Sequence, residues 1–445
     1  MSKKVKTQNF LKLYNTLYTL RTEVVNQGLA LFDQWYPHIQ RSMFVYSCRN
    51  LAFYLALRCH DLRKLQKALL PLGLSSLGRG EARAIANLDA AMASLGRICN
   101  LAPKDLVDYP SPKAFFYGNN LLLHNTNQIF GVHRPYRTHI MVTLPTEAAT
   151  DYELVKKLVD AGMDCARINC AHDSRLYWAR MISLVRKAEK ATGKYCKIYM
   201  DIAGPKARIA SILTVGPDVK LINGSQLFLA KGDISQYPHS YKGAQVIACS
   251  IPEIFKHLKV GAPVLIDDGK IRAQVTSITK EGAVLKIIFA RALGARLKNE
   301  RSINFPETPL EVSPLSSKDL KDLDFIATHA DAIGYSFVKN AEDIKLLQKE
   351  LKKRCGSKAS QLALIAKIET KDAVANLPEI IVQAASFQPF GIMIARGDLA
   401  VEVGYKRLSE LQEEILWICE AAHIPVIWAT QVLENLNKSG VATRS

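Results

Sequence analysis

The chain has 445 residues, of which 48% are hydrophobic, and this length suffices for two or three domains with buried cores. Its formal net charge is +18, and residues 1–136 carry 17 Lys and Arg against 7 Asp and Glu. No zinc-finger spacing or RNA-binding aromatic motif accompanies this charge, so nucleic acid is not an expected partner. The most apolar stretch, 44–62, is interrupted by Arg49, Arg58 and His60 and is too charged to span a bilayer.

The nine cysteines are scattered along the chain without CxxC spacing. This pattern argues against a disulfide framework or a zinc ribbon and favours reduced thiols in a cytoplasmic protein. The basic residues at 1–6 are not followed directly by an apolar core, so no secretory signal peptide is expected.

The first 136 residues are predicted to form a helical region. Leucine and alanine recur at three- and four-residue spacing through 51–57 and 82–98, which is typical of helices. A looser stretch, 102–135, contains four prolines and is interpreted as a linker or covering segment. No chemistry can be read from this region.

From residue 137 onward, short apolar runs alternate with amphipathic helical segments. The expected helices are 151–161, 176–191, 318–328, 341–354 and 408–422. The expected strands are 139–142, 166–168, 197–200, 332–335, 362–366, 390–395 and 425–429. Repeated strand–helix units predict an α/β fold with a parallel sheet, and a TIM-type (β/α) barrel rather than an open sheet. Since only seven such strands precede Ser445, the barrel is expected to lack its eighth strand.

A long gap separates the third and fourth expected strands. Residues 209–308 are rich in Val, Ile and Gly and alternate in the manner of strands, as in 270–275, so an inserted all-β domain is predicted. The predicted organisation is a helical N-terminal region at 1–136, a first barrel part at 137–208, the inserted β domain at 209–308 and an incomplete second barrel part at 309–445.

Six of the seven expected strands end in polar or charged residues. In a parallel barrel these ends converge on one face, where active sites lie. The charged and amide side chains at these ends include Arg167, Asn169, Asp201, Lys367, Glu369, Arg396 and Asp398. Glu369 and Asp398 are hard oxygen ligands suited to Mg²⁺. Arg167 and Arg208 offer planar forks for phosphate oxygens, although Arg208 could equally be part of an ordinary ion pair.

Two further features point to phosphoryl chemistry. Lys367 lies two residues from Glu369, and a lysine beside a metal and a phosphate stabilises the charge that develops on a transferring phosphoryl group. Residues 396–398 precede a helical segment, so their backbone N–H groups could hold a substrate carboxylate, which Gly397 would allow to approach closely. No GxxxxGK[ST] pattern occurs, so a Walker-type nucleotide site is not predicted.

Six segments together resemble the motifs of pyruvate kinase in order and spacing. They are ARINCAH at 166–172, MDIAGP at 200–205, IDDG at 266–269, AKIE at 366–369, MIARGDL at 393–399 and WATQVLE at 428–434. The resemblance extends over about 137–445 and includes the inserted β domain at the family's position.

This resemblance implies a phosphotransferase of glycolysis that uses Mg²⁺ to transfer a phosphoryl group from phosphoenolpyruvate to ADP, giving pyruvate and ATP. Lys367 is implied as the main catalytic cation, with Arg167 at the same phosphoryl group and Thr430 near the carbon that is protonated. Mg²⁺ would be bound by Glu369 and Asp398. The implied substrate-binding residues are Arg167, Lys367, Ala395, Arg396, Gly397, Asp398 and Thr430. The implied nucleotide-binding residues are Asn169, His172, Tyr177 and Arg208. A membrane is not an expected partner, whereas a homo-oligomer is compatible with the resemblance.

The monovalent-cation pocket of the family departs from its usual pattern. Asn169 and Asp201 line this pocket, but the family's serine is Ala171 in this chain, and a common glutamate after Gly-Pro is Lys206. The ammonium of Lys206 could supply the positive charge that K⁺ otherwise supplies, so K⁺ is not expected to be required.

Two other functions are compatible with the sequence. One is a catalytically weak pyruvate-kinase-like binding or regulatory protein, because the expected barrel is incomplete. The other is a Mg²⁺-dependent lyase barrel acting on pyruvate or phosphoenolpyruvate. The retained Arg167, Lys367, Glu369 and Asp398 argue against loss of activity, and the β insertion argues against a plain lyase barrel.

Overall fold

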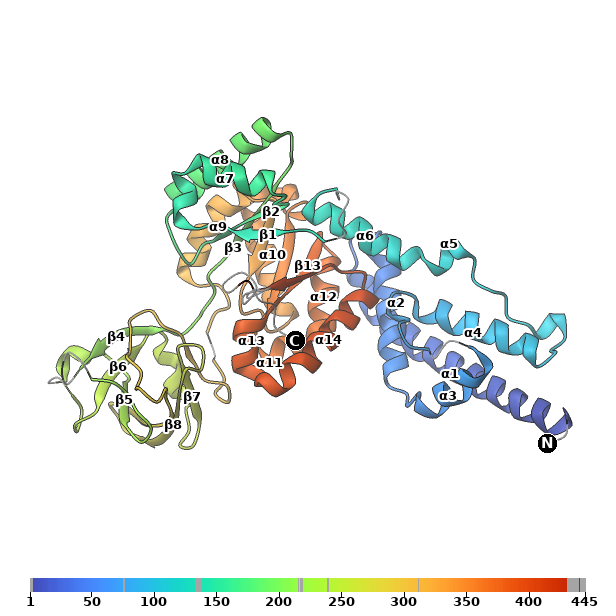
Figure 1. Ribbon diagram of the computed structural model, residues 1–445, viewed down its shortest axis with the longest axis horizontal. Helices are drawn as coiled ribbons and strands as arrows, with labels where there is room; N and C mark the ends of the chain where they lie inside the picture. Colours follow the sequence, from blue (N-terminus) through green and yellow to red (C-terminus); the bar gives the residue numbers. More distant parts are fainter. Residues whose placement is uncertain are drawn as a thin grey trace.

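The computed structural model describes residues 3–74, 77–132, 138–214, 216, 219–237, 240–310, 312–429 and 440. Three parts follow one another along the longest axis of the molecule (Figure 1). A parallel sheet with its helices lies at the centre, a β domain lies on one side of it, and an N-terminal helical region lies on the other.

The central sheet is parallel and curled, and among the described residues it has seven strands. They are β1 (Met141–Thr143), β2 (Cys165–Asn169), β3 (Lys197–Asp201), β11 (Ala332–Tyr335), β12 (Ala363–Ile368), β13 (Phe390–Ala395) and β14 (Val426–Ala429). Each strand of this sheet lies beside the one that follows it in the sequence of the chain. This order is that of a (β/α) barrel, so the predicted fold class is confirmed.

Amphipathic helices follow the strands and cover the outer face of the sheet. They are α7 (Tyr152–Asp160), α8 (Arg175–Thr192), α9 (Ser317–His329), α10 (Ala341–Cys355), α11 (Lys371–Ala375), α12 (Leu377–Ala385), α13 (Arg396–Val403) and α14 (Tyr405–Ala421). The start of α9 is fixed by a reciprocal capping box between Ser316 and Asp319. The largest core of the molecule forms between these helices and the sheet, around buried residues such as Ile168, Ile333 and Leu364.

A second, smaller core fills the inside of the curled sheet. Because successive side chains of a strand point to opposite faces, every second residue of these strands faces inward. The inward-facing cluster contains Cys165, Tyr199, Ala332, Ala363, Ile365, Met393 and Ala429 together with Ile129 and Phe130. The last two residues end α6 (Tyr117–Phe130), which therefore covers the amino-terminal end of the strands. Thus the stretch 102–135, predicted as a linker or covering segment, contains a helix with a covering role.

The N-terminal region is helical, as predicted, and has its own apolar core around Leu17, Leu88 and Leu95. Its other helices are α1 (Lys3–Trp35), α2 (Phe44–Arg58), α3 (Arg63–Leu69), α4 (Ala84–Ile98) and α5 (Pro112–Phe115). The side chain of Asn50, on α2, donates hydrogen bonds to the carbonyls of Glu81 at 2.7 Å and Ala421 at 2.8 Å. This buried amide joins the helical region to the end of α14.

The β domain is built on a mixed seven-stranded sheet in the order β10-β7-β8-β9-β5-β6-β4. Its strands are β4 (Ile209–Leu213), β5 (Gln226–Ala230), β6 (Gln245–Cys249), β7 (Pro263–Ile266), β8 (Ile271–Ile278), β9 (Gly282–Phe289) and β10 (Ile303–Asn304). The chain enters this domain after β3 and returns before α9, so the inserted domain is all-β, as the alternating pattern of 209–308 predicts.

Within the described parts of the chain, no helix has both the length and the apolar character of a membrane span. All nine cysteines are free thiols, and seven of them are buried.

Candidate active site

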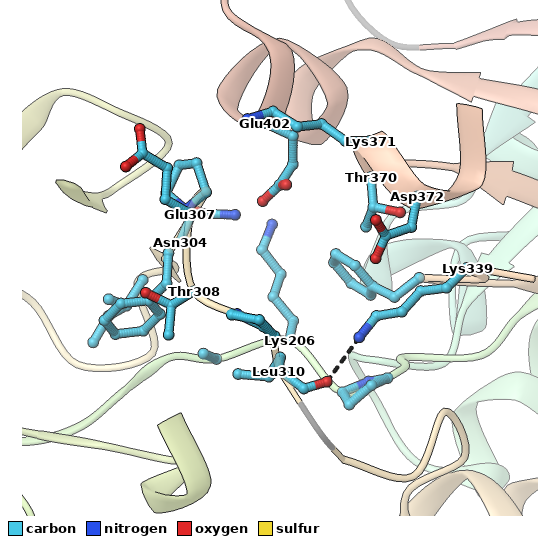
Figure 2. A pocket seen from close by; sticks show the side chains of 17 residues that line it. Lys206, Asn304, Glu307, Thr308, Leu310, Lys339, Thr370, Lys371, Asp372 and Glu402 are labelled. Atoms are coloured by element: carbon cyan, nitrogen blue, oxygen red, sulfur yellow. Dashed lines mark hydrogen bonds between the residues drawn. The ribbon is translucent and has the colours of Figure 1, made fainter. Parts of the chain in front are cut away.

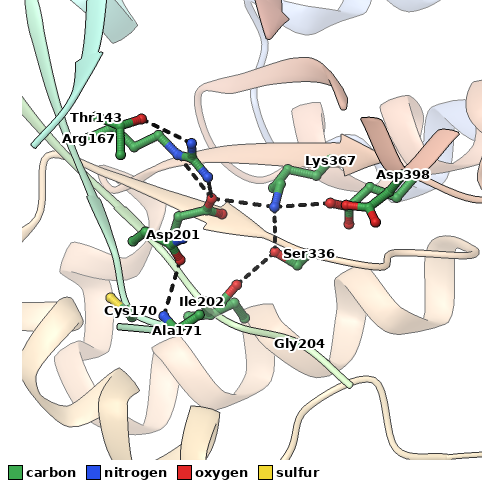
Figure 3. A network of polar contacts seen from close by, with 12 residues as sticks. Thr143, Arg167, Cys170, Ala171, Asp201, Ile202, Gly204, Ser336, Lys367 and Asp398 are labelled. Carbon is green, nitrogen blue, oxygen red and sulfur yellow. Dashed lines mark hydrogen bonds and ion pairs between the residues drawn. The ribbon is translucent and has the colours of Figure 1, made fainter. Parts of the chain in front are cut away.

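A buried group of charged side chains lies at the carboxyl ends of β2, β3 and β12 (Figure 3). Asp201, the last residue of β3, is only 1% exposed. Its Oδ2 accepts a hydrogen bond from Nε of Arg167 at 3.1 Å and a second one from Nη2 of the same guanidinium. The Nζ of Lys367 lies 3.4 Å from this same oxygen. One carboxylate oxygen therefore holds two cations that come from strands on either side of it.

Lys367 continues the network toward the next carboxylate. Its Nζ lies 3.0 Å from Oε1 of Glu369 and donates a hydrogen bond to the hydroxyl of Ser336 at 2.8 Å. The Ser336 hydroxyl donates in turn to the carbonyl of Ile202 at 2.7 Å. The lysine side chain is thus fixed in one direction, across the mouth of the curled sheet.

The opposite charges of this network stabilise one another's ionised forms. Burial by itself lowers the pKa of Lys367, but the carboxylates of Asp201 and Glu369 outweigh it, so the pKa lies above its ordinary value. Burial likewise opposes ionisation of Asp201, but Lys367 and Arg167 outweigh it and the pKa of that carboxyl is lowered. Both side chains are therefore charged at neutral pH.

Glu369 lies in a different environment. Burial raises its pKa, and the nearby Asp398 carboxylate raises it further, against the opposing charge of Lys367. Its Oε2 accepts a hydrogen bond from the N–H of Phe337 at 2.6 Å. A buried carboxylate with a second carboxylate beside it is an environment that an additional cation would stabilise.

Glu369 and Asp398, the residues predicted to bind Mg²⁺, provide two neighbouring carboxylates that such a cation would stabilise. Among the described residues, no group of three or more His, Cys, Asp and Glu side chains could hold a metal. Two carboxylates are enough for Mg²⁺, because this ion usually keeps several waters and binds substrate phosphate oxygens. Glu369 lies at the end of β12, and Asp398 lies in the first turn of α13.

Lys206 places its ammonium beside one of these two carboxylates. Its Nζ lies 2.5 Å from Oδ1 of Asp398 and 3.9 Å from Oδ1 of Asp268, which belongs to the β domain. It also lines a cavity of about 300 Å³ that is formed by both connections to the β domain, at 205–207 and 303–310 (Figure 2). On the barrel side of this cavity, burial raises the pKa of Glu402.

The turn from β13 into α13 carries the predicted substrate-binding residues 395–398. The Nε of Arg396 donates to the carbonyl of Ala429 at 3.0 Å, and its guanidinium carbon lies 5.1 Å from the centre of the Trp428 ring. The side chain of Arg396 is therefore directed to the end of β14. Apart from the neighbouring backbone of α13, no atom of the described residues lies within 4 Å of the point where a side chain at Gly397 would begin, so these residues leave open space beside this backbone.

The residues predicted to bind the nucleotide lie in two places. Asn169 ends β2, His172 lies in the connection that follows it, and Tyr177 lies in the first turn of α8; the last two are exposed. Arg208 lies at the entrance to the β domain, where its Nη1 donates to the carbonyl of Glu300 at 2.8 Å. The described contacts do not bring Arg208 together with the other three. Thr430 lies outside the described residues.

Ser336 and Thr143 also belong to this network, although they were assigned no role from the sequence. Ser336 bonds Lys367, and the Thr143 hydroxyl accepts a hydrogen bond from Nη1 of Arg167 at 3.1 Å. Ser336 follows β11 and Thr143 ends β1, so the convergence of strand ends that indicates the other site residues also applies to them.

Known proteins are similar to the part of the chain that contains this site. Residues 135–445 match the family model described as pyruvate kinase, barrel domain. The chain is 31% identical over 310 residues to the pyruvate kinase of Geobacillus stearothermophilus, which covers 69% of this chain and 50% of that protein. It is 34% identical over 319 residues to the pyruvate kinase of Methylorubrum extorquens, covering 70% of this chain and 60% of that protein. It is 31% identical over 317 residues to human pyruvate kinase PKLR, covering 69% and 52%. The chain therefore spans about half to three fifths of the length of these curated relatives.

Proposed function

The chain belongs to the pyruvate kinase family, and we propose that it transfers the phosphoryl group of phosphoenolpyruvate to ADP, giving pyruvate and ATP. The observation that carries this proposal is the buried sequence of alternating charges Arg167, Asp201, Lys367 and Glu369 at the strand ends. It presents two fixed cations at one mouth of the barrel, as transfer of an anionic group requires.

The proposed roles follow from this geometry. Lys367, fixed between two carboxylates and Ser336, would stabilise the charge that develops on the phosphoryl group. Arg167 would bind its oxygens with the N–H groups that remain available. The backbone N–H groups at the start of α13 would hold the substrate carboxylate beside Gly397. When bound, Mg²⁺ would be held by Glu369 and Asp398 and would neutralise charge on the phosphate oxygens.

Asn169, His172, Tyr177 and Arg208 are proposed to bind ADP between the barrel and the β domain. Because Arg208 lies apart from the other three, this role requires the β domain to close over the nucleotide, which would also exclude water. The hinge would lie near Gly204, whose φ of 68° suits glycine.

We further propose that K⁺ is not required. Asn169 Oδ1 already accepts a hydrogen bond from the N–H of Ala171 at 3.1 Å, and Asp201 Oδ2 is occupied by two cations. One oxygen of each residue that lines the family's monovalent-cation pocket is therefore already engaged. Lys206 contacts Asp398 and not, among the described contacts, Asn169 or Asp201, so its charge would act beside the magnesium ligand. A cytoplasmic location, which the free cysteines favour, is part of the same proposal.

The test is formation of pyruvate by the purified chain in the presence of Mg²⁺. Turnover that requires both phosphoenolpyruvate and ADP is expected, with one ATP formed per pyruvate. Binding of phosphoenolpyruvate without turnover would favour a binding or regulatory protein. Consumption of phosphoenolpyruvate that does not depend on ADP would favour a lyase. The Lys367→Met variant is the control for contaminating kinase.

A further inference from the structure

A tyrosine lies directly beneath the central carboxylate of the site. Tyr199 precedes Asp201 by two residues on β3, so both side chains point into the inside of the curled sheet. Tyr199 is completely buried, and its hydroxyl lies 3.4 Å from Oδ1 of Asp201. Since an ionised carboxylate only accepts hydrogen bonds, the phenol is the donor.

The space for this hydroxyl exists because of a glycine on the neighbouring strand. Gly334 of β11 lies opposite Asp201 in the register of the sheet. A Cβ at this position would overlap the Tyr199 hydroxyl and lie 2.5 Å from Oδ1 of Asp201. The large Tyr199 on β3 therefore fits beside Gly334 on β11. This fit places the Tyr199 hydroxyl, a hydrogen-bond donor, next to Oδ1 of Asp201.

The two oxygens of Asp201 consequently have different partners. Oδ2 contacts Arg167 and Lys367, while Oδ1 accepts a hydrogen bond from the Tyr199 hydroxyl. Rotation of an aspartate carboxylate about its last torsion is soft and roughly two-fold, so packing alone does not decide which way the oxygens point. Arginine often binds both oxygens of a carboxylate in parallel, whereas Arg167 donates from Nε and Nη2 to Oδ2 alone, the oxygen that Lys367 also approaches.

We infer that Tyr199 is a positioning residue for phosphoryl transfer, whose hydroxyl holds Asp201 in the rotation at which a single oxygen serves both Arg167 and Lys367. The inference rests on the proposed function for its kinetic consequence, but the rotation itself is independent of substrate. Tyr199 acts through Asp201 and needs no contact of its own with substrate or metal.

The kinetic test is Tyr199→Phe, which removes one oxygen and keeps the ring. The control is Tyr335→Phe on β11, because Tyr335 is also completely buried but its hydroxyl has no hydrogen-bond partner within the described residues. We expect kcat of Tyr199→Phe to fall about tenfold, with KM for ADP and the melting temperature nearly unchanged, because only the cations at the phosphoryl group are misplaced. Tyr335→Phe should retain kcat within about twofold. A lower melting temperature with unchanged kcat in Tyr199→Phe would show that Tyr199 contributes only to packing of the core, and would overturn the inference.

Crystal structures of the wild type and Tyr199→Phe provide a test that needs no activity. In the variant, the Asp201 carboxylate should turn so that Oδ2 no longer lies within hydrogen-bond distance of both Arg167 and Lys367. An unchanged carboxylate would overturn the inference. A wild-type chain without turnover would overturn the proposed function alone, and the two structures would still decide the role of Tyr199.

Discussion

The ammonium of Lys206 lies 2.5 Å from Oδ1 of Asp398, although the two residues are 192 positions apart in the chain. Lys206 belongs to the connection that leads into the β domain, and Asp398 to the first turn of α13. This ion pair therefore joins the proposed hinge of the β domain to a proposed magnesium ligand, so the charge at this ligand depends on a residue of that hinge.

Independence from K⁺ is the first prediction. The site already contains the positive charge of Lys206, and Ala171 offers no hydroxyl to a monovalent ion. We expect rates in potassium and tetramethylammonium salts to agree within about twofold at equal ionic strength, since both salts screen surface charges alike. Activation by K⁺ that saturates at millimolar concentration would contradict this prediction.

Loss of the Lys367 ammonium is expected to affect chemistry far more than metal binding. Lys367→Met should lower kcat by about three decades, because a preorganised buried charge is removed from the place where charge develops. Replacement of the exposed Lys345, whose ion pair with Glu342 lies on the surface of α10, is the matched control and should leave kcat unchanged. Initial rates over a range of Mg²⁺ concentrations separate the two effects. Near-normal turnover in Lys367→Met would show that the proposed role is wrong.

The sequence predicted much of this site because strand ends meet at one face. Arg167, Asp201, Lys367 and Glu369 all lie near the carboxyl end of an expected strand, and the sheet brings them together as expected. Their roles and the domain boundaries stay predictions. The fit between Tyr199 and Gly334 could not be predicted, because it depends on the register of two strands that are distant in the sequence.

The contact between the helical region and the barrel could not be predicted either. It depends on polar side chains that belong to no motif, and it joins residues more than 370 positions apart. Helical periodicity indicates which face of α2 is buried but not what it packs against.

Asn50 gives a prediction for the stability of this contact. Its amide donates to two carbonyls, and its Oδ1 accepts from the N–H of Ala84 at 3.0 Å. Asn50→Leu would remove the side-chain partner of these three backbone groups, at a cost of about 3 kcal/mol in the free energy of unfolding. Asn26, on the exposed side of α1, provides the control, and Asn26→Leu should change that free energy by less than about 0.5 kcal/mol. Denaturant unfolding of the two variants checks the difference, and equal midpoints would contradict the proposed contribution of Asn50.

The surroundings of His423 predict how the contact between the helical region and the barrel responds to pH. The ring is completely buried, with Nδ1 lying 2.8 Å from the Ser47 hydroxyl and Nε2 lying 3.0 Å from the carbonyl of Ala82. A carbonyl only accepts, so Nε2 carries the proton and Nδ1 accepts from Ser47. This arrangement holds the neutral imidazole, and burial lowers the pKa of His423 from its ordinary value of 6.5 to about 4.

The sign of the pH effect follows from this lowered pKa. As the pH falls below 6.5, the unfolded chain binds a proton at His423 that the folded chain does not bind until about pH 4. The folded state therefore loses up to about 3 kcal/mol of stability across this window and keeps its full stability above it. His423→Asn, which tolerates the φ of 54° at this position, should be less stable than the wild type at pH 8, but the difference should shrink toward pH 4.5. The exposed His38 is the control, since His38→Gln should keep the wild-type pH dependence. A constant difference between wild type and His423→Asn from pH 8 to 4.5 would mean that the buried imidazole accepts its second proton without breaking the contact.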